Sequence, residues 1–232
     1  MQLGGIRKAI CHRPAAFIFD YHDKGEDMIE FIEVAASKQS LARRSLVFGV
    51  GINDADYMSS YTVDGVRVRC PFYVKWKGML ERAYCDTYKA KWPTYAECTV
   101  DERWHIFSAF KLWMNKQEWA GKDLDKDILI PGNKHYSPDT CCFVSKEINS
   151  LIKGKFSKRS SLPAGVYLTR GRYQSTIYRN SRNESLGYFD DPKEASSVYR
   201  AHKAEYFRDL ALEQTDGRIK VGLMSHAALI DI

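Results

Sequence analysis

One segment near the C-terminus constrains the fold more than any other part of the chain. Residues 165–191, GVYLTRGRYQSTIYRNSRNESLGYFDD, contain short runs of β-branched and aromatic residues separated by the turn-forming pairs Arg-Gly and Asn-Ser. The runs cover about 165–169, 172–179 and 184–189. Asp191 and Pro192 follow and favour the start of a helix, because Pro is well tolerated in the first helical turn. The segment therefore predicts a three-stranded antiparallel sheet packed on one helix.

The middle run predicts that this sheet has two different faces, because side chains alternate along a strand. The first set consists of Tyr173, Ser175 and Ile177. The helix would cover this set with Ala195, Val198, Tyr199, His202 and Tyr206. The second set, which would stay exposed as a polar, arginine-bearing face, consists of Arg172, Gln174, Thr176 and Tyr178.

Composition favours a polyanionic partner. The chain has 35 Lys and Arg against 29 Asp and Glu, and its 14 Tyr include several interleaved with Arg in the C-terminal third, a mixture suited to stacking and phosphate contact. No apolar run approaches the roughly 18 residues of a membrane helix, and no signal peptide opens the chain, so we expect a cytoplasmic protein without membrane contact. Six Cys without a CxxC pair indicate reduced, mostly buried thiols rather than a zinc site.

The rest of the chain predicts mainly helices. AAFIFDY, 15–21, is typical of a strand, and a helical pattern covers 23–44. Two aromatic stripes at helical spacing, at 72–84 and at 101–119 with Asp101 as N-cap, indicate core helices. GKFSKRSS is typical of a basic linker. We therefore divide the chain into an extension (1–48), a helical scaffold with a hairpin (49–153), the linker (154–161), the sheet domain (162–212) and a C-terminal tail (213–232).

The hairpin is expected within residues 124–149, LDKDILIPGNKHYSPDTCCFVSKEIN. Two short apolar runs, ILI and CCFV, flank a Pro-Gly-Asn-Lys connection. Asp125, Lys126 and Asp127 crowd together immediately before the first run, where a buried strand normally tolerates no charge. This arrangement is unusual both for an ordinary core strand and for an ordinary loop.

Two stretches of the sheet domain, GVYLTRGRYQSTIYR and SLGYFDDPKEASSVYRAHKA with its Leu-Gly-Tyr-Phe step, resemble the plant ethylene-response-factor (Apetala-type) DNA-binding domain and its phage counterparts. Such domains lay their sheet in the major groove of double-stranded DNA. The resemblance implies DNA contacts at Tyr167, Thr169, Arg170, Arg172, Gln174, Thr176, Tyr178, Asn183 and Ser185. Several arginines and tryptophans of the family are absent from these positions, so the family's target sequences are not carried over.

The region from Gly49 to Asn149, through CPFYVKWKGMLERAY and the hairpin sequence, resembles phage-encoded HNH endonucleases of the homing kind. In that fold a β-hairpin and a helix hold one divalent ion. The resemblance implies that Asp125 and Asn149 are the metal ligands and that Lys126 stands where the general-base His is expected.

Phosphodiester hydrolysis needs a base, a positive charge at the phosphate and help for the leaving oxygen. One Mg²⁺ or Mn²⁺ held by Asp125 and Asn149 would supply the last two, because carboxylate and amide oxygens suit Mg²⁺. Lys126 would neutralise phosphate charge, or act as base if burial lowers its pKa. His135 is the nearest alternative base, and Asp127 is either a further ligand, a group that orients water, or a solvated charge.

The sequence thus predicts an α+β protein with a helical scaffold, a ββα-metal hairpin and a three-stranded sheet on one helix. The expected function is metal-dependent cleavage or nicking of double-stranded DNA. A DNA-binding protein that keeps the nuclease fold without its chemistry is the alternative. A weaker third interpretation is an inhibitor or adaptor whose N-terminal extension binds a partner protein.

Overall fold

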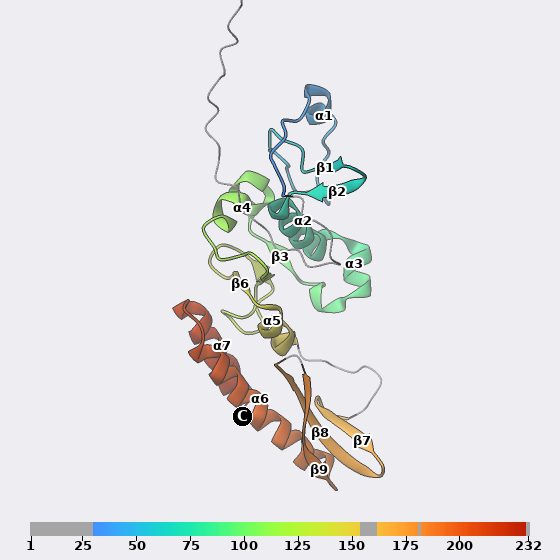
Figure 1. Ribbon diagram of the computed structural model, residues 1–232, viewed down its shortest axis with the longest axis vertical. Coiled ribbons are helices and arrows are strands. Elements are labelled where there is room, and N and C mark those ends of the chain that lie inside the picture. The colour runs from blue at the N-terminus through green and yellow to red at the C-terminus, as the bar shows by residue number, and fades with distance from the viewer. Residues whose placement is uncertain (1–29, 154–161, 181, 231–232) are drawn as a thin grey trace, which may run out of the picture.

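The computed structural model describes residues 30–153, 162–180 and 182–230 of an elongated α+β protein (Figure 1). The strand expected at 15–21 and the linker expected at 154–161 lie outside these residues. The hairpin of strands β1 and β2 (residues 60–69) and the sheet of strands β7 to β9 (residues 166–189) occupy opposite ends of the molecule, and helices α2 to α5 lie between them (Figure 1). Within the described part of the chain, no helix is long and apolar enough to cross a membrane.

The described helical elements differ widely in length, from single turns to five turns or more. They are α1 (Lys38–Ala42), α2 (Pro71–Tyr84), α3 (Asp86–Lys91), η1 (Pro93–Tyr95), η2 (Glu102–His105), α4 (Phe107–Met114), α5 (Lys146–Lys153), α6 (Pro192–Leu212) and α7 (Gly217–Ile230). The strands are β1 (Ser60–Val63), β2 (Val66–Arg69), β3 (Thr99–Val100), β4 (Asp123–Asp125), β5 (His135–Tyr136), β6 (Cys142–Val144), β7 (Val166–Thr169), β8 (Arg172–Arg179) and β9 (Arg182–Phe189).

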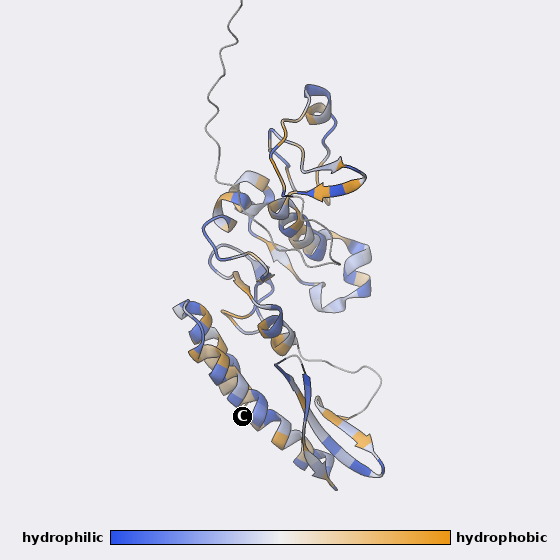
Figure 2. Ribbon diagram, in the orientation of Figure 1, coloured by the Kyte–Doolittle hydropathy of each residue, from blue (hydrophilic) through white to orange (hydrophobic). Residues whose placement is uncertain are grey.

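The strands form small sheets. β1 and β2 make an antiparallel hairpin, β3 pairs with β5 in parallel, and β4 pairs with β6 in the antiparallel sense. Val and Arg alternate along β2, which Figure 2 shows as alternating hydrophobic and hydrophilic bands, and Val68 is the buried member of this strand. The largest sheet is antiparallel, with strand order β7-β8-β9.

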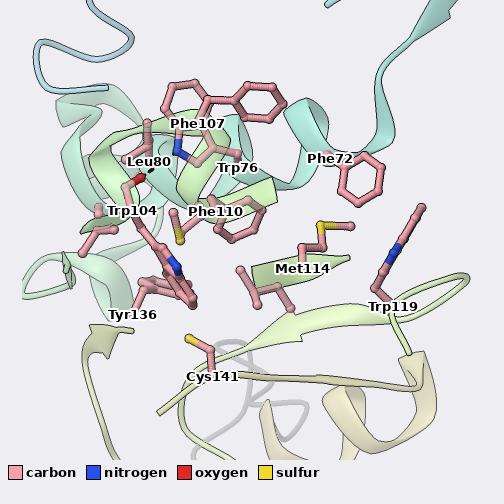
Figure 3. Close-up of a cluster of buried hydrophobic side chains, with 14 of the residues drawn as sticks. Phe72, Trp76, Leu80, Trp104, Phe107, Phe110, Met114, Trp119, Tyr136 and Cys141 are labelled. Carbon is pink, nitrogen blue, oxygen red and sulfur yellow. Dashed lines mark hydrogen bonds between the residues drawn. The ribbon is translucent and has the colours of Figure 1, made fainter. Parts of the chain in front are cut away.

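An aromatic core holds the N-terminal half together. Helix α2 forms as the stripe predicted, and Trp76, Met79 and Leu80 on its inner face are fully buried. Figure 3 shows this face meeting the aromatic side chains of η2 and α4. The Trp76 indole donates a hydrogen bond to the carbonyl of Trp104 over 2.7 Å, which satisfies its one polar atom inside the core.

The prediction of one continuous helix at 101–119 is wrong. The segment divides into η2 and α4, because Ile106 is extended and the backbone on either side of it pairs with Ile52. Asp101 caps the first piece, accepting a hydrogen bond from the N–H of Arg103. Tertiary hydrogen bonds have here replaced two of those that a continuous helix would make.

The predicted helix at 23–44 is also wrong within residues 30–44, where only the single turn α1 is helical. The backbone N–H of Ala36 donates to Asp56, and the carbonyl of Val34 accepts from Met58, so this segment pairs with another part of the chain. The ring centroids of Phe31 and Tyr61 lie 5.5 Å apart. The apolar residues of this segment therefore pack from an extended backbone and not from a helix.

A second apolar cluster joins the hairpin region to the C-terminal helices. Cys142 and Ile148 pack in one cluster with Phe207 of α6 and Leu223 of α7. The segment interpreted as a tail, 213–232, therefore contains a packed helix, α7, which lies along α6 (Figure 1). The β7–β9 sheet and the hairpin region both contribute side chains to this cluster, so they pack as one unit.

Candidate functional site

The β4–β6 pair places two carboxylates on one face of strand β4. Leu124 packs in the aromatic core, so its neighbours Asp123 and Asp125 leave the strand on the opposite face. Their cross-strand partners, Val144 and Cys142, belong to the cluster that contains Ile148 of α5. An antiparallel strand pair and the helix that follows it thus enclose Asp123 and Asp125 on one side.

Asn149 of α5 contacts Asp123. Its amide nitrogen donates to one oxygen of the Asp123 carboxylate over 3.1 Å, while Lys75 of α2 donates to the other over 3.2 Å. The amide oxygen of Asn149 is buried and accepts no hydrogen bond from the described residues. Sequence reasoning paired Asn149 with Asp125 and missed Asp123 and Lys75, although the two-residue period of a strand places Asp123 on the same face as Asp125.

Asp125 is buried and turned toward its own loop. One carboxylate oxygen accepts hydrogen bonds from the backbone N–H groups of Asp127 and Ile128, each at 2.8 Å. Burial and, to a smaller extent, the negative charge of Asp127 together raise the pKa of Asp125 to about 6. Burial also opposes ionisation of Asp127, but hydrogen bonding to Asp125 and the ammonium of Lys126 outweigh it and lower the Asp127 pKa. The two carboxyls therefore titrate as a pair.

Lys126 closes the loop between the two strands. Its ammonium is buried and donates to the carbonyl of Asn133 over 2.8 Å and to the carboxylate of Asp127 over 3.1 Å. The Asn133 side chain in turn donates to the carbonyls of Lys126 and His135. Two of the protons of Lys126 are thus directed at protein acceptors of its own loop.

His135 lies on β5, where its Nδ1 is 2.9 Å from the hydroxyl of Thr99 on β3. This contact fixes the orientation of the ring, and the ring is partly exposed. Among the described residues, no three His, Cys, Asp or Glu side chains gather in one group. The oxygens that meet at α5 instead come from the Asp123 carboxylate and the Asn149 amide.

The outward face of the three-stranded sheet gathers the residues expected to contact DNA. Directly paired residues of an antiparallel sheet share one face. The cross-strand pairs on this face are Thr169 with Arg172, Tyr167 with Gln174, Gln174 with Tyr188, Thr176 with Ser185, and Tyr178 with Asn183. Ser175 and Ile177, on the other face of β8, are buried, and α6 packs on the sheet.

Three tyrosines give this face an aromatic surface. Tyr167, Tyr178 and Tyr188 are 45%, 44% and 49% exposed. Tyr188 was missed by sequence reasoning, because a β-bulge between Ser175 and Thr176 shifts the register of β9. Arg170 is exposed in the turn that joins β7 to β8, and its backbone has a positive φ of 51°.

Hydrogen bonds hold the polar side chains of the face in place. Arg172 donates to Asp190 over 2.9 Å and to the carbonyl of Tyr188 over 3.0 Å. Gln174 donates to the hydroxyl of Ser185 over 3.1 Å. Because the Arg172–Asp190 pair is exposed, it contributes little stability and can exchange for a ligand at low cost.

In comparisons with known proteins, no family model, no curated protein and no solved structure matches this chain. The geometry of the sheet face and of the hairpin is therefore what bears on function.

Proposed function

We propose that this protein is a metal-dependent DNA endonuclease that binds duplex DNA through the outward face of β7–β9 and hydrolyses a phosphodiester bond beside the β4–β6 hairpin. The observation that carries the proposal is the sheet face, where Arg, Gln, Asn, Thr and Tyr side chains point the same way from three paired strands. Strands can enter a DNA groove and present such side chains to base edges. The net charge of +6 adds long-range attraction for the phosphates.

The residues around α5 fit a single divalent cation. The buried amide oxygen of Asn149 has no hydrogen-bond donor among the described residues, and the nitrogen of the same amide donates to the Asp123 carboxylate. Asp125 offers a second carboxylate from the same face of β4. Oxygens of this kind are the ligands that Mg²⁺ and Mn²⁺ prefer. Asp123 thus joins Asp125 and Asn149 as a proposed ligand.

When bound, a divalent cation supplies positive charge to the scissile phosphate and activates water. The remaining work falls to the chain's own residues. Lys75, held at Asp123, adds a second positive charge next to the site. His135, with Nδ1 held by Thr99, is the proposed general base through Nε2, because imidazole exchanges protons near neutral pH. Lys126 keeps the loop closed and takes no proton from water in this scheme.

Incubation with supercoiled plasmid tests the proposal. We expect nicked or linear DNA with Mg²⁺ or Mn²⁺ and none with chelator. Asp123→Asn keeps the size of the side chain and removes its charge, and it should slow cleavage by about 10²-fold or more with DNA affinity unchanged, since positioning of the cation accounts for much of the catalysis. Asp139→Asn is the matched control, because Asp139 is exposed and, among the described residues, forms its ion pair with the exposed Arg103.

Two results would contradict this assignment. Cleavage by Asp123→Asn at the wild-type rate would remove Asp123 from the site. Equal slowing by Asp139→Asn would show that loss of any nearby carboxylate acts through general electrostatics. The sheet face is tested separately with Thr176→Glu, which places a negative charge at its centre and should abolish binding of duplex DNA, whereas Thr215→Glu, at an exposed position outside the sheet, should not.

DNA binding without cleavage is the second candidate function. It is favoured by the contacts of the two lysines: the ammonium of Lys75 already lies against Asp123, and that of Lys126 is directed at Asn133 and Asp127. Cations of the chain's own would then balance the partly exposed carboxylates of Asp123 and Asp127. If wild type binds a selected DNA sequence but leaves it intact with either metal ion, this second function replaces the first.

A further inference from the structure

A cavity of about 500 Å³ opens at the end of the molecule opposite the sheet. The chain that follows α1, the start of β1 and the outer face of α2 form its walls. Neither the hairpin site nor the sheet face contributes a residue to it. Its volume falls within the range of small-molecule and cofactor sites, which begins near 300 Å³.

All charged residues that line this cavity are cationic. Arg43 and Arg44 come from the chain after α1, and Lys77 comes from α2. Four serines add hydroxyl groups, and no Asp or Glu belongs to the lining. Within the part of the chain that the structure describes, no ion pair involves any of the three cations. Among the described residues, no carboxylate therefore pairs with these three cations.

Arg44 is built into the wall. Its guanidinium donates to the carbonyls of Asn53, Ala55 and Tyr57, so three backbone acceptors fix its position without cancelling its charge. Arg43 and Lys77 are exposed. The Arg44 guanidinium is thus fixed in place, whereas the side chains of Arg43 and Lys77 are free to reorient toward a bound anion.

We propose that this cavity binds a phosphate group. In the DNA complex this group would be a phosphate of the DNA backbone, outside the segment that the sheet contacts; this second part rests on the proposed function. Guanidinium groups donate to phosphate oxygens in bidentate fashion, ammonium groups add charge, and serine hydroxyls donate further hydrogen bonds. Walls free of carboxylates suit an anion and disfavour a metal ion. The N-terminal part of the chain thereby acquires a role in holding nucleic acid.

Inorganic phosphate is the first probe, used with the full chain and amide NMR. At constant ionic strength, replacing chloride by phosphate should shift the amide resonances of Ser59 and Ser60 to saturation. The double variant Arg43→Ala/Lys77→Ala should lose these shifts and keep the rest of its spectrum, because both side chains are exposed. Absence of saturable shifts in wild type would overturn the proposal without involving DNA.

The salt dependence of duplex binding is the second measurement. The double variant should lower the slope of log affinity against log salt by up to about 2, since each lost phosphate contact removes about 0.9. Lys116→Ala/Lys220→Ala, a double variant of equal charge change at exposed positions outside the cavity, should leave the slope nearly unchanged. An equal effect of both pairs would overturn the assignment to the cavity.

The two measurements separate the proposals. Phosphate binding without any DNA binding would overturn the proposed function and leave the phosphate site standing. Phosphate binding together with an unaltered slope would overturn the backbone part, and the cavity would then take a free phosphate ester. DNA binding by a chain that shows no phosphate shifts would overturn the cavity proposal alone.

Discussion

Gly222, in the middle of α7, provides a sharp test of how the C-terminal helix meets the hairpin loop. A Cβ atom there would lie 2.3 Å from the carbonyl oxygen of Ile128 and 3.2 Å from the Cα of Leu129. Both neighbours are backbone atoms, so no side-chain rotation can relieve the contact. Because ordinary carbon–oxygen contacts lie near 3.3 Å, Gly222→Ala requires α7 and the loop to separate by about 1 Å.

The expected magnitude follows from two opposing terms. Replacing Gly by Ala inside a helix normally stabilises it by about 1 kcal/mol. Overpacking costs about 1–3 kcal/mol, and we expect the upper end because the obstacle is rigid backbone. Gly222→Ala should therefore lower the free energy of unfolding by about 2 kcal/mol, which corresponds to a fall in Tm of about 4–8 °C for a chain of this size.

Urea unfolding followed by two probes measures this effect. All five tryptophans precede residue 120, so their fluorescence reports on the N-terminal half, whereas far-UV circular dichroism also reports on α6 and α7. If the two halves unfold together, both probes should show the same loss of stability. If they unfold separately, the loss should appear in the circular dichroism alone.

Gly78→Ala is the matched control. Gly78 lies in the interior of α2, and a Cβ there would meet only the end of the Arg82 side chain at 3.9 Å. This substitution should stabilise the protein by up to about 1 kcal/mol. Should Gly222→Ala prove as stabilising as Gly78→Ala, the described packing of α7 on the Ile128 loop would be refuted.

Three further changes test contacts around the hairpin. Asp125 has a pKa raised from 3.8 to about 6, so its protonated form contributes stability that is complete below about pH 4 and is lost as the pH rises through 6. Asp125→Asn should remove this pH dependence, measured by urea unfolding in chelator. Lys126→Met should cost about 1–3 kcal/mol, because two acceptors lose a buried donor; unchanged stability with lost cleavage would instead make Lys126 catalytic. Glu147→Ala should speed hydrogen exchange at the Asn180 amide, which donates to that carboxylate, and an unaltered exchange rate would contradict the contact.

The sequence predicted best those elements whose two faces differ in polarity. β8 alternates because one face is covered by α6, and the predicted range 172–179 is the observed one. Helix α2 was equally predictable, because Phe72, Trp76, Met79 and Leu80 recur at the helical period and bury together. In both cases local periodicity and tertiary burial agree.

The failures arose where tertiary contacts overrode local pattern. Phe31 and Ala35 have helical spacing, yet their segment pairs with the chain near Tyr57. Helix α7 was missed although Asp216 caps it by accepting from the N–H of Arg218, a start signal legible in the sequence. The contact of His226 with the carbonyl of Asp127 joins residues far apart in the chain, and no local pattern could indicate it.

If both proposed activities are present, that long-range packing would couple them. His226 of α7 holds the loop of Asp127 through a hydrogen bond of 3.1 Å and stacks on Phe207 of α6, the helix that covers the sheet. Glu147 of α5 accepts from Asn180 at the β8–β9 turn. The sheet and the hairpin are therefore joined both by packed side chains and by a hydrogen bond. DNA held on the sheet face would keep a fixed position relative to Asp123, and the phosphodiester bond that is cleaved would be selected by this packing as well as by the base sequence that the sheet contacts.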